Sequence, residues 1–444
     1  MNVKLLLAIV ASCCFSCLSA QNNYRLTLKQ CIDTAIKKNI DLRQTKLSQE
    51  AADINVGLAK SAQVPVVYGD FGQGLNLGRS IDPFNNDYVN RTIGYGSYGV
   101  GADVILYSGS RIKNTIRQSE AASDAAHYDV ALAKQQILLN VITAYIQVLN
   151  TLEQLEMTKS RARLSDQQLQ RLELKQKKGV VAPSQVTDLK GQLLNDQLAV
   201  VDLQNALEWY KMELAQQMNI QYSKNLEVVQ INIDTVLTPY EKGSSAVYQY
   251  ALLTFPQVNA AEQRTKSASF AAKAAKGLRY PQLFASSRVQ TVYTSSAATG
   301  DGKVAFSNQF LNNRSANFVI GVRVPIVDRS IKKTIQLADN YVKSVKVEEE
   351  RTKNEVWQKI EREYVAMNNA FVKYRTLQTQ IEAYQLSYQA AEARFVTGVD
   401  NSLVYLAAKN NLDRANINLI NARYDYLLRK KVLDFYRSAL QDKL

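Results

Sequence analysis

The sequence predicts a mainly α-helical fold with a β contribution, built from one structural unit that occurs twice. The first observation is an internal repeat, in which Ala59-Lys60 corresponds to Ala275-Lys276 and Pro65 corresponds to Pro281 at the same offset in numbering. The second observation is that the 444 residues include only 18 glycines and 7 prolines. A repeat governs the choice of fold, and few glycines and prolines favour long, uninterrupted elements.

A separate segment opens the chain. Lys4 supplies a positive charge, an apolar stretch runs from residue 5 to residue 11, and small residues precede Gln21. This layout predicts a secretory signal peptide over residues 1–20, because the apolar stretch is too short to cross a bilayer as a helix. The segment from Val10 to Cys13 also fits a loose lipobox, and in that alternative Cys13 becomes a lipidated N-terminus. Both alternatives take the protein out of the cytoplasm.

The first repeat is predicted over residues 21–243. A helical segment ends near a proline, two extended segments follow within residues 63–107, and a helical hairpin over residues 110–219 breaks at Gly179. The predicted elements span about 27–62 (helical), 63–78 and 93–107 (strands), 110–177 (long helix) and 183–219 (last helix).

The second repeat is predicted over residues 244–444, with the same order of elements. Its two extended segments fall within residues 281–327, and its helical hairpin over residues 329–440 breaks at Gly398. The predicted elements span about 245–279 (helical), 281–293 and 316–327 (strands), 329–396 (long helix) and 401–440 (last helix).

Apolar and polar residues alternate in the extended segments, which predicts a sheet with one apolar and one polar side. The apolar set is Tyr98, Val100, Ala102, Val104 and Leu106 in the first repeat and Phe318, Ile320, Val322, Val324 and Ile326 in the second. A soluble sandwich would alternate in the same way, but four strands cannot fill two sheets or close a barrel. We therefore expect several chains to pool four strands each into one barrel with its apolar side outward, as in an outer membrane.

The long helices carry apolar residues at alternating spacings of three and four, which predicts a coiled-coil seam. The seam comprises Tyr374, Leu377, Ile381, Tyr384, Tyr388, Ala391 and Phe395 in the second repeat, and more loosely Leu152, Leu155, Ala162, Leu169 and Leu172 in the first. About 68 residues at about 1.5 Å each give a rod of roughly 100 Å.

The chain is basic, with 54 lysines and arginines against 40 aspartates and glutamates and a net charge of +14. Its basic residues are spread along helical faces, and no aromatic-basic motif of RNA-binding proteins occurs, so we assign the charge to solvated faces and an anionic envelope and expect no nucleic acid partner. No run of eighteen apolar residues follows the first segment, so a membrane role would need a barrel or an anchor.

Several features recur in the same order in both repeats. They are Gly179 and Gly398 at the helical turns, the alanine and proline pattern that enters the strands, and the strand-to-helix joints LYSGSRIKNTI and IVDRSIKKTI. Together they resemble the TolC family of outer-membrane efflux proteins over about residues 25–440. The doubled arrangement after a signal peptide carries this resemblance.

The resemblance implies a homotrimer in the outer membrane of a Gram-negative bacterium. Four strands per protomer would form a trimeric 12-stranded β-barrel, continued by a 12-helix periplasmic α-barrel. The implied function is the exit duct of a tripartite efflux or type I secretion system. Such a duct passively conducts substrate from an inner-membrane RND-type or ABC-type exporter, through a periplasmic adaptor.

The resemblance also places the periplasmic tips at the turns KKGVVAPSQ and VTGVDNSLV. It implies that adaptor docking involves Lys178, Gly179, Val180, Gly398 and Val399. In the family, aspartates six and nine residues after the second-repeat glycine often ring the closed tip. Here those positions hold Val404 and Ala407, so this ring is not carried over.

Asp188 and Asp400 are the candidates for a pore constriction. Three symmetry-related carboxylates around a pore would favour cations. The alternative for each is an ordinary solvated or helix-capping role. Lys178, Arg394 and Asp400 would also be able to pair across the tip, with little energetic gain if they are exposed.

The sequence contains no catalytic, cofactor or metal motif that stands out. His127 lies among Ala125, Ala126 and Tyr128 without evident partners, and Cys31 is expected in the core. The glycine clusters GQGLNLG and GYGSYGVG lack the lysine and serine or threonine of a phosphate-binding loop. We therefore expect no enzyme and no cofactor. The alternatives to an export duct are a periplasmic coiled-coil scaffold or adaptor, and a secreted enzyme or binding protein.

Overall fold

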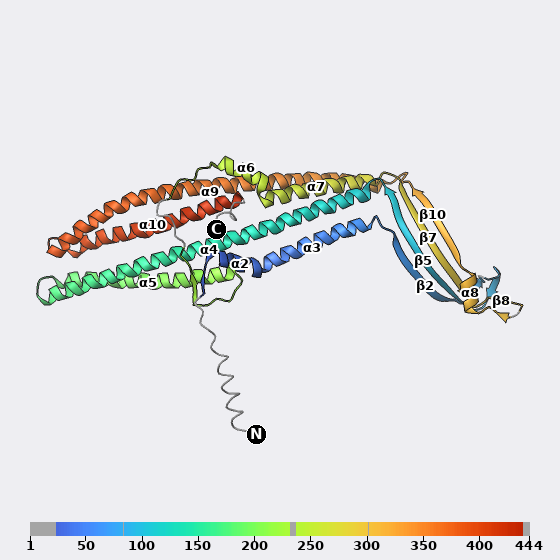
Figure 1. The fold of residues 1–444 in the computed structure, drawn as a ribbon, viewed down its shortest axis with the longest axis horizontal. Coiled ribbons are helices and arrows are strands. Elements are labelled where there is room, and N and C mark those ends of the chain that lie inside the picture. The colour runs from blue at the N-terminus through green and yellow to red at the C-terminus, as the bar shows by residue number, and fades with distance from the viewer. Residues whose placement is uncertain (1–23, 83, 231–236, 301, 438–444) are drawn as a thin grey trace, which may run out of the picture. The chain divides into compact units, whose positions relative to one another are not determined.

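A computed structural model describes residues 24–82, 84–230, 237–300 and 302–437, which form two compact units (Figure 1). Unit 1 comprises residues 1–46, 129–259 and 352–444, and unit 2 comprises residues 47–128 and 260–351. The predicted signal peptide and the alternative lipidation site Cys13 lie outside the described residues. Each unit contains segments of both predicted repeats, and the repeat boundaries stay a prediction.

Unit 1 consists of helices and one parallel strand pair, β1 (Tyr24–Leu26) with β6 (Leu226–Val228). Figure 1 shows its two helical hairpins side by side, one from α4 and α5 and the other from α9 and α10. The helices are α2 (Leu28–Lys38), the start of α3 (Ile40–Ser61), the C-terminal part of α4 (Arg111–Lys177), α5 (Pro183–Gln217), α6 (Ser244–Thr254), the start of α7 (Pro256–Gly277), the C-terminal part of α9 (Arg329–Thr397) and α10 (Ser402–Tyr436).

The core of unit 1 confirms the predicted seam of the second repeat. Tyr374, Leu377, Tyr388, Ala391 and Phe395 are buried, and the other two members, Ile381 and Tyr384, are partly buried. Burying apolar side chains at this spacing removes a continuous stripe of each helix from water, which is what holds such long helices together. A second buried cluster lies near the two turns and comprises Leu169, Leu172, Leu189, Leu193, Tyr388, Phe395, Tyr405 and Leu412.

The first helical segment of each repeat consists of two helices. Asn39, between α2 and α3, has an extended backbone, and its Oδ1 accepts a hydrogen bond from the backbone N–H of Leu42 at 2.8 Å. It therefore ends one helix and caps the next. Phe255 separates α6 from α7 because the following Pro256 disfavours a helical backbone at the residue before it.

Unit 2 contains a four-stranded antiparallel sheet in the order β10-β7-β5-β2. These are the four strands that the alternation predicted: β2 (Val66–Asn76), β5 (Ile93–Ser108), β7 (Gln282–Thr294) and β10 (Ser315–Arg323). The unit also holds the short pairs β3 (Arg79–Ile81) with β4 (Tyr88–Asn90) and β8 (Ala298–Thr299) with β9 (Gly302–Lys303), the helix α8 (Phe306–Asn312), and the remaining parts of α3, α4, α7 and α9.

The two sides of the sheet differ in polarity, as predicted. Val100 lies opposite Val289, and the register places Val67 and Ile320 on the same side. These four side chains are between 52% and 68% exposed. The other side carries an ion pair between Arg288 and Asp70. Monomeric soluble proteins rarely expose so continuous an apolar surface, which therefore marks an interaction face.

Three predicted members of the apolar set depart from the prediction, one because it leaves the register of its strand and two because they lie beyond the end of theirs. A bulge between Ile105 and Tyr107 removes Leu106 from the register of β5. Strand β10 ends at Arg323, so Val324 and Ile326 lie beyond it. Pro325 has no backbone N–H with which to continue the ladder, and this accounts for the early end. Within the described residues, no helix is both long enough and apolar enough to cross a membrane.

Candidate functional site at the helical turns

Both helical hairpins of unit 1 turn at a glycine with a left-handed backbone. The φ angle is 75° at Gly179 and 80° at Gly398. After α4, the N–H of Gly179 donates to the carbonyl of Gln176 and that of Val180 donates to the carbonyl of Lys175. The same two hydrogen bonds recur after α9 at Gly398 and Val399. Both turns are therefore Schellman motifs, in which glycine avoids the strain that a Cβ would cause.

The residues proposed for docking occupy equivalent and exposed positions in these motifs. Lys178, Gly179 and Val180 follow α4, and Gly398 and Val399 follow α9. Val180 is 68% exposed and Val399 is 73% exposed. The two turns are neighbours, because Nζ of Lys175 donates to the carbonyl of Val396 at 2.9 Å. Each protomer thus presents two apolar side chains at matching places, one from each turn.

Asp400 and Asp188 have different partners. Nε of Arg394 donates to Oδ2 of Asp400 at 2.7 Å, so the pair that the sequence suggested forms within one turn, without Lys178. Asp188 lies inside α5, where its Oδ2 accepts a hydrogen bond from Oγ of the buried Ser402 at 2.7 Å. An arginine therefore compensates the charge of Asp400, whereas the side chain that donates to Asp188 is an uncharged hydroxyl.

Aromatic side chains pack against one another next to the second turn. The rings of Phe395 and Tyr405 stack with centroids 4.8 Å apart and planes 12° apart, and Tyr388 lies 5.9 Å from Tyr405. Tyr405 is 1% exposed. Burial raises the pKa of the Tyr405 hydroxyl above its usual value, so it stays protonated at physiological pH. This stack fixes α10 against the end of α9.

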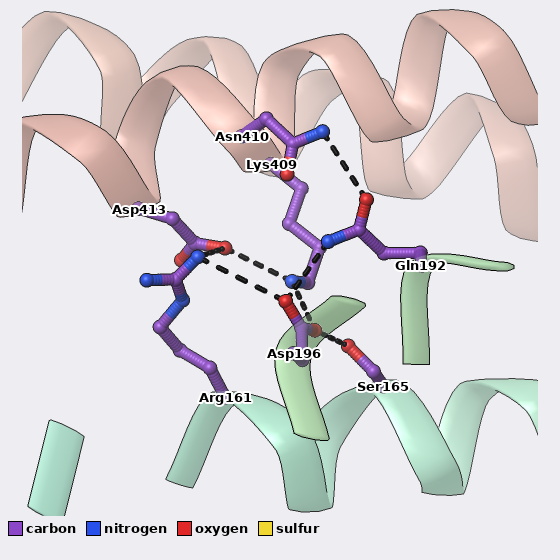
Figure 2. A network of polar contacts seen from close by, with 7 residues as sticks. All are labelled: Arg161, Ser165, Gln192, Asp196, Lys409, Asn410 and Asp413. Carbon is purple, nitrogen blue, oxygen red and sulfur yellow. Dashed lines mark hydrogen bonds and ion pairs between the residues drawn. The ribbon is translucent and has the colours of Figure 1, made fainter. Parts of the chain in front are cut away.

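Further from the turns, a buried network of polar side chains connects three helices of unit 1 (Figure 2). At its centre lies Lys409 of α10, whose side chain is 4% exposed. Its Nζ lies 3.1 Å from Oδ2 of Asp196 in α5 and 2.9 Å from Oδ2 of Asp413. Arg161 of α4 lies 2.9 Å from the same Asp413. Two cations and two carboxylates make the group neutral, which is the condition for burying charges.

Neutral side chains also donate hydrogen bonds to both carboxylate oxygens of Asp196. Oγ of Ser165 donates to Oδ2 at 2.5 Å, and Nε2 of Gln192 donates to Oδ1 at 2.9 Å. Asn410 in turn donates to Oε1 of Gln192 at 3.2 Å, as Figure 2 shows. The network thus ties both hairpins of the protomer together at a defined register.

Sequence reasoning missed this network, although a signal was present. Lys409 and Asp413 are four residues apart on α10, on the same face as the buried Tyr405 and Leu412. Asp196 likewise follows Leu189 and Leu193 along the buried side of α5. Charged residues at positions of an apolar seam are costly unless they are paired, so their presence there indicates a partner on the facing helix.

The described residues contain no group of three or more histidine, cysteine, aspartate or glutamate side chains that is arranged to hold a metal ion. In unit 2, Nδ1 of His127 lies 2.9 Å from the carbonyl of Ser123 and Nε2 lies 3.0 Å from Nε2 of Gln49. In unit 1, Cys31 is fully buried, and burial raises the pKa of its thiol to about 12.

The chain is similar to proteins that carry substances across outer membranes. The family model described as "Outer membrane efflux protein" matches residues 31–243 and 247–435. The outer membrane efflux protein BepC of Brucella suis is 22% identical over 410 residues, which cover 90% of this chain and 83% of BepC. The outer membrane protein TolC of Vibrio cholerae is 30% identical over 133 residues, which cover 28% of this chain and 29% of TolC.

Solved structures show the same fold. The channel protein CusC superposes with a TM-score of 0.80 at 18% identity, over 92% of this chain and 91% of CusC. The outer membrane channel CmeC of Campylobacter jejuni superposes with a TM-score of 0.78 at 17% identity, over 93% of this chain and 86% of CmeC.

Proposed function

We propose, from the premise that the chain belongs to the outer membrane efflux protein family, that three copies of it assemble into one export duct. The protein is an outer-membrane efflux channel with its helical part in the periplasm, and its family is one of transport ducts rather than enzymes. In the proposed trimer, twelve strands form a single barrel and twelve helices continue it as a periplasmic tunnel. The alternative of a periplasmic scaffold or adaptor has no support from the family or from the related folds.

The four-stranded sheet is the observation that carries this proposal. Within the described residues, β2 and β10 are its two edges, and each has a partner on one side only. An open edge presents unpaired N–H and C=O groups, and closing the sheet into a barrel removes every edge. Three sheets of four strands close a barrel of twelve, with the exposed apolar side outward.

Exposed apolar residues on the helices of unit 1 support contact between copies. Leu194, Leu198 and Trp209 on α5 are between 57% and 62% exposed. Val365 and Val372 on α9 are seven residues apart, and both are more than half exposed. Stripes of this spacing are typical of helices that pack against a further helix.

At the narrow end of the duct, we assign the cation-attracting carboxylate to Asp188. Three copies would bring three Asp188 carboxylates and three Arg394–Asp400 pairs to the tip. The paired Asp400 contributes little net field, because its arginine lies 2.7 Å away. A ring of three uncompensated carboxylates in a pore attracts cations.

The same tip is our proposed docking surface for a periplasmic adaptor, which links the duct to an inner-membrane RND-type or ABC-type exporter. The supporting observation is that Val180 and Val399 are exposed at equivalent places beside Lys178. An adaptor hairpin that packs on both turns would cover these two valines. Cross-linking from Val180→Cys and Val399→Cys should capture the adaptor, whereas Val347→Cys on α9 should not.

The experiment that tests the duct is purification from membranes in detergent, followed by native mass spectrometry and conductance measurements in planar bilayers. We expect a mass of three chains and discrete conductance steps. A monomer that needs no detergent, or a trimer without conductance, would refute the proposal. The mass tests the assembly and the conductance tests the duct, so the two parts fail separately.

A further inference from the structure

In unit 2, six lysine and arginine residues lie where two strands of the sheet, β5 and β10, are each followed by a long helix. We call this set the basic collar: Arg111, Lys113, Arg323, Arg329, Lys332 and Lys333. Asp328 is the only acidic residue in residues 104–119 and 323–338. Its Oδ1 already accepts hydrogen bonds from N–H and Oγ of Ser330, at 2.8 and 2.6 Å, as the cap of α9. The collar is therefore a local excess of positive charge.

The folded chain does not use this charge internally. Among the described residues, no carboxylate lies within ion-pair distance of any member of the collar. Helices α4 and α9 have no acidic residue in their first turn and begin with arginine. Basic residues at the start of a helix are repelled by the helix dipole, so their placement lowers the stability of the isolated protein. A partner outside the chain would compensate for this.

The sheet register brings both joints to the same edge. Ser108 at the end of β5 pairs with Gln282, and Gln282 pairs with Arg323 at the end of β10. Between the joints lies a hollow of about 380 Å³, whose lining includes Arg111, Arg323 and Tyr280 together with Val327 and the helix-capping Asp328. Two guanidinium groups beside a tyrosine suit a phosphate group, because arginine presents several donors in a fixed planar fork.

Apolar residues next to the collar indicate that the partner is a lipid rather than a soluble anion. Ile326 is 90% exposed and Val327 is 85% exposed, the two highest values among the large apolar side chains of the described residues. They stand between Arg323 and Arg329 in the chain. The exposed apolar side of the sheet extends to Val322, near the end of β10 and close in sequence to these two residues. Apolar groups beside cations match the boundary between acyl chains and anionic headgroups.

We propose that the basic collar binds the phosphate groups of anionic phospholipids in the periplasmic leaflet of the outer membrane, while Ile326 and Val327 insert among the acyl chains. The inference rests on the proposed function for the direction in which the sheet enters the membrane. It assigns a role to the strand-to-helix joints that recur in the two repeats. The collar would fix the depth of the sheet in the bilayer.

The first test compares lipid retention by the assembled protein in nanodiscs made of phosphatidylglycerol and phosphatidylcholine. Native mass spectrometry counts the lipids of each kind that stay bound. Each lysine or arginine near an anionic surface strengthens binding about fivefold. Arg329→Gln/Lys332→Gln/Lys333→Gln should therefore lower the preference for phosphatidylglycerol at least about tenfold, and high salt should lower it in the wild type.

The control is Lys343→Gln/Lys346→Gln/Lys359→Gln, which removes three exposed cations further along the same helix. This variant should keep the preference of the wild type. Equal retention of both lipids by the wild type, or an unchanged preference in the collar variant, would overturn the proposal. The mass of the assembly is read in the same spectra, so a failure of trimer formation is seen separately from a failure of lipid selection.

The second test locates Ile326 with tryptophan fluorescence. In a background of Trp209→Phe/Trp357→Phe, Ile326→Trp should be quenched by phosphatidylglycerol with brominated acyl chains. Val347→Trp, which is also exposed on α9, should not be quenched. An unquenched Ile326→Trp would show that a neighbouring copy or water covers this segment, and would refute the insertion of Ile326 and Val327.

Discussion

Replacing Lys409 by methionine is the sharpest test of the buried network. Methionine keeps the length and the apolar stem of lysine but removes its charge. The substitution leaves Asp196 and Asp413 buried with one cation, Arg161, so the network acquires a net charge of one electron. A buried charge without compensation is among the most costly changes in a protein interior.

The expected magnitude follows from the remaining contacts. Removing one partner of a buried ion pair costs about 3–5 kcal/mol. Arg161 still lies 2.9 Å from Asp413, and Ser165 and Gln192 still donate to Asp196, so the lower end applies. We expect Lys409→Met to destabilise local structure by about 3 kcal/mol, which corresponds to roughly a hundredfold change in an opening equilibrium.

Hydrogen exchange of the assembled protein measures this locally. Amides of α10 around residue 409 should exchange roughly a hundredfold faster in Lys409→Met, because their opening becomes easier. Lys190→Met is the matched control, since Lys190 is exposed on α5 and its replacement should change exchange less than about threefold.

A double variant separates charge from packing. Lys409→Met/Asp413→Leu leaves Asp196 with Arg161, which lies 4.0 Å away, and restores neutrality. The double variant should therefore exchange more slowly than Lys409→Met alone. Additive effects of the two substitutions, or a single variant within about threefold of the wild type, would refute the reasoning that paired charge holds α5 and α10 together.

Three further predictions concern other parts of unit 1. Gly398→Ala should lower the free energy of unfolding by about 1–2 kcal/mol, because φ is 80° at this position. In the middle of α5, Gly191→Ala should instead raise the free energy of unfolding by about 0.4–1 kcal/mol. Hydrogen exchange of the two hairpins distinguishes the two signs. Arg394→Gln should raise cation selectivity in reversal-potential measurements and Asp188→Asn should lower it, whereas equal selectivity in both would contradict the assignment of the constriction. Burial raises the pKa of the Cys31 thiol to about 12 from 9.0, so its contribution to stability is complete below pH 9 and declines as the pH rises toward 12; the melting temperature should fall less steeply above pH 9 in Cys31→Ala than in the wild type.

The sequence determined the order and length of the main elements because those depend on local chemistry. Gly179 and Gly398 mark helix ends since only glycine adopts a positive φ without strain, and both turns lie where they were predicted. Pro65 and Pro281 stand directly before β2 and β7. The spacing of apolar residues along α9 likewise followed from the helical period alone.

The apolar pattern alone did not locate the breaks in the first helical segments or the bulge in β5. Asn39 and Pro256 carried the information that the first helical segments break, but the apolar pattern continued through them. The alternation of β5 continued through Leu106, although the bulge there depends on the pairing with β7. A pattern on one strand does not reveal where its partner changes register.

Which side chains meet depends on how the helices pack. Asp196 and Lys409 belong to different repeats and come together because α5 packs against α10, and Arg161 joins them from α4. Asp188 and Asp400 looked alike in the sequence, but packing gives one a serine hydroxyl and the other an arginine. Charge compensation acts between atoms a few ångströms apart in space. It therefore depends on packing across the chain, whereas turns and helix ends depend on residues that are neighbours in sequence.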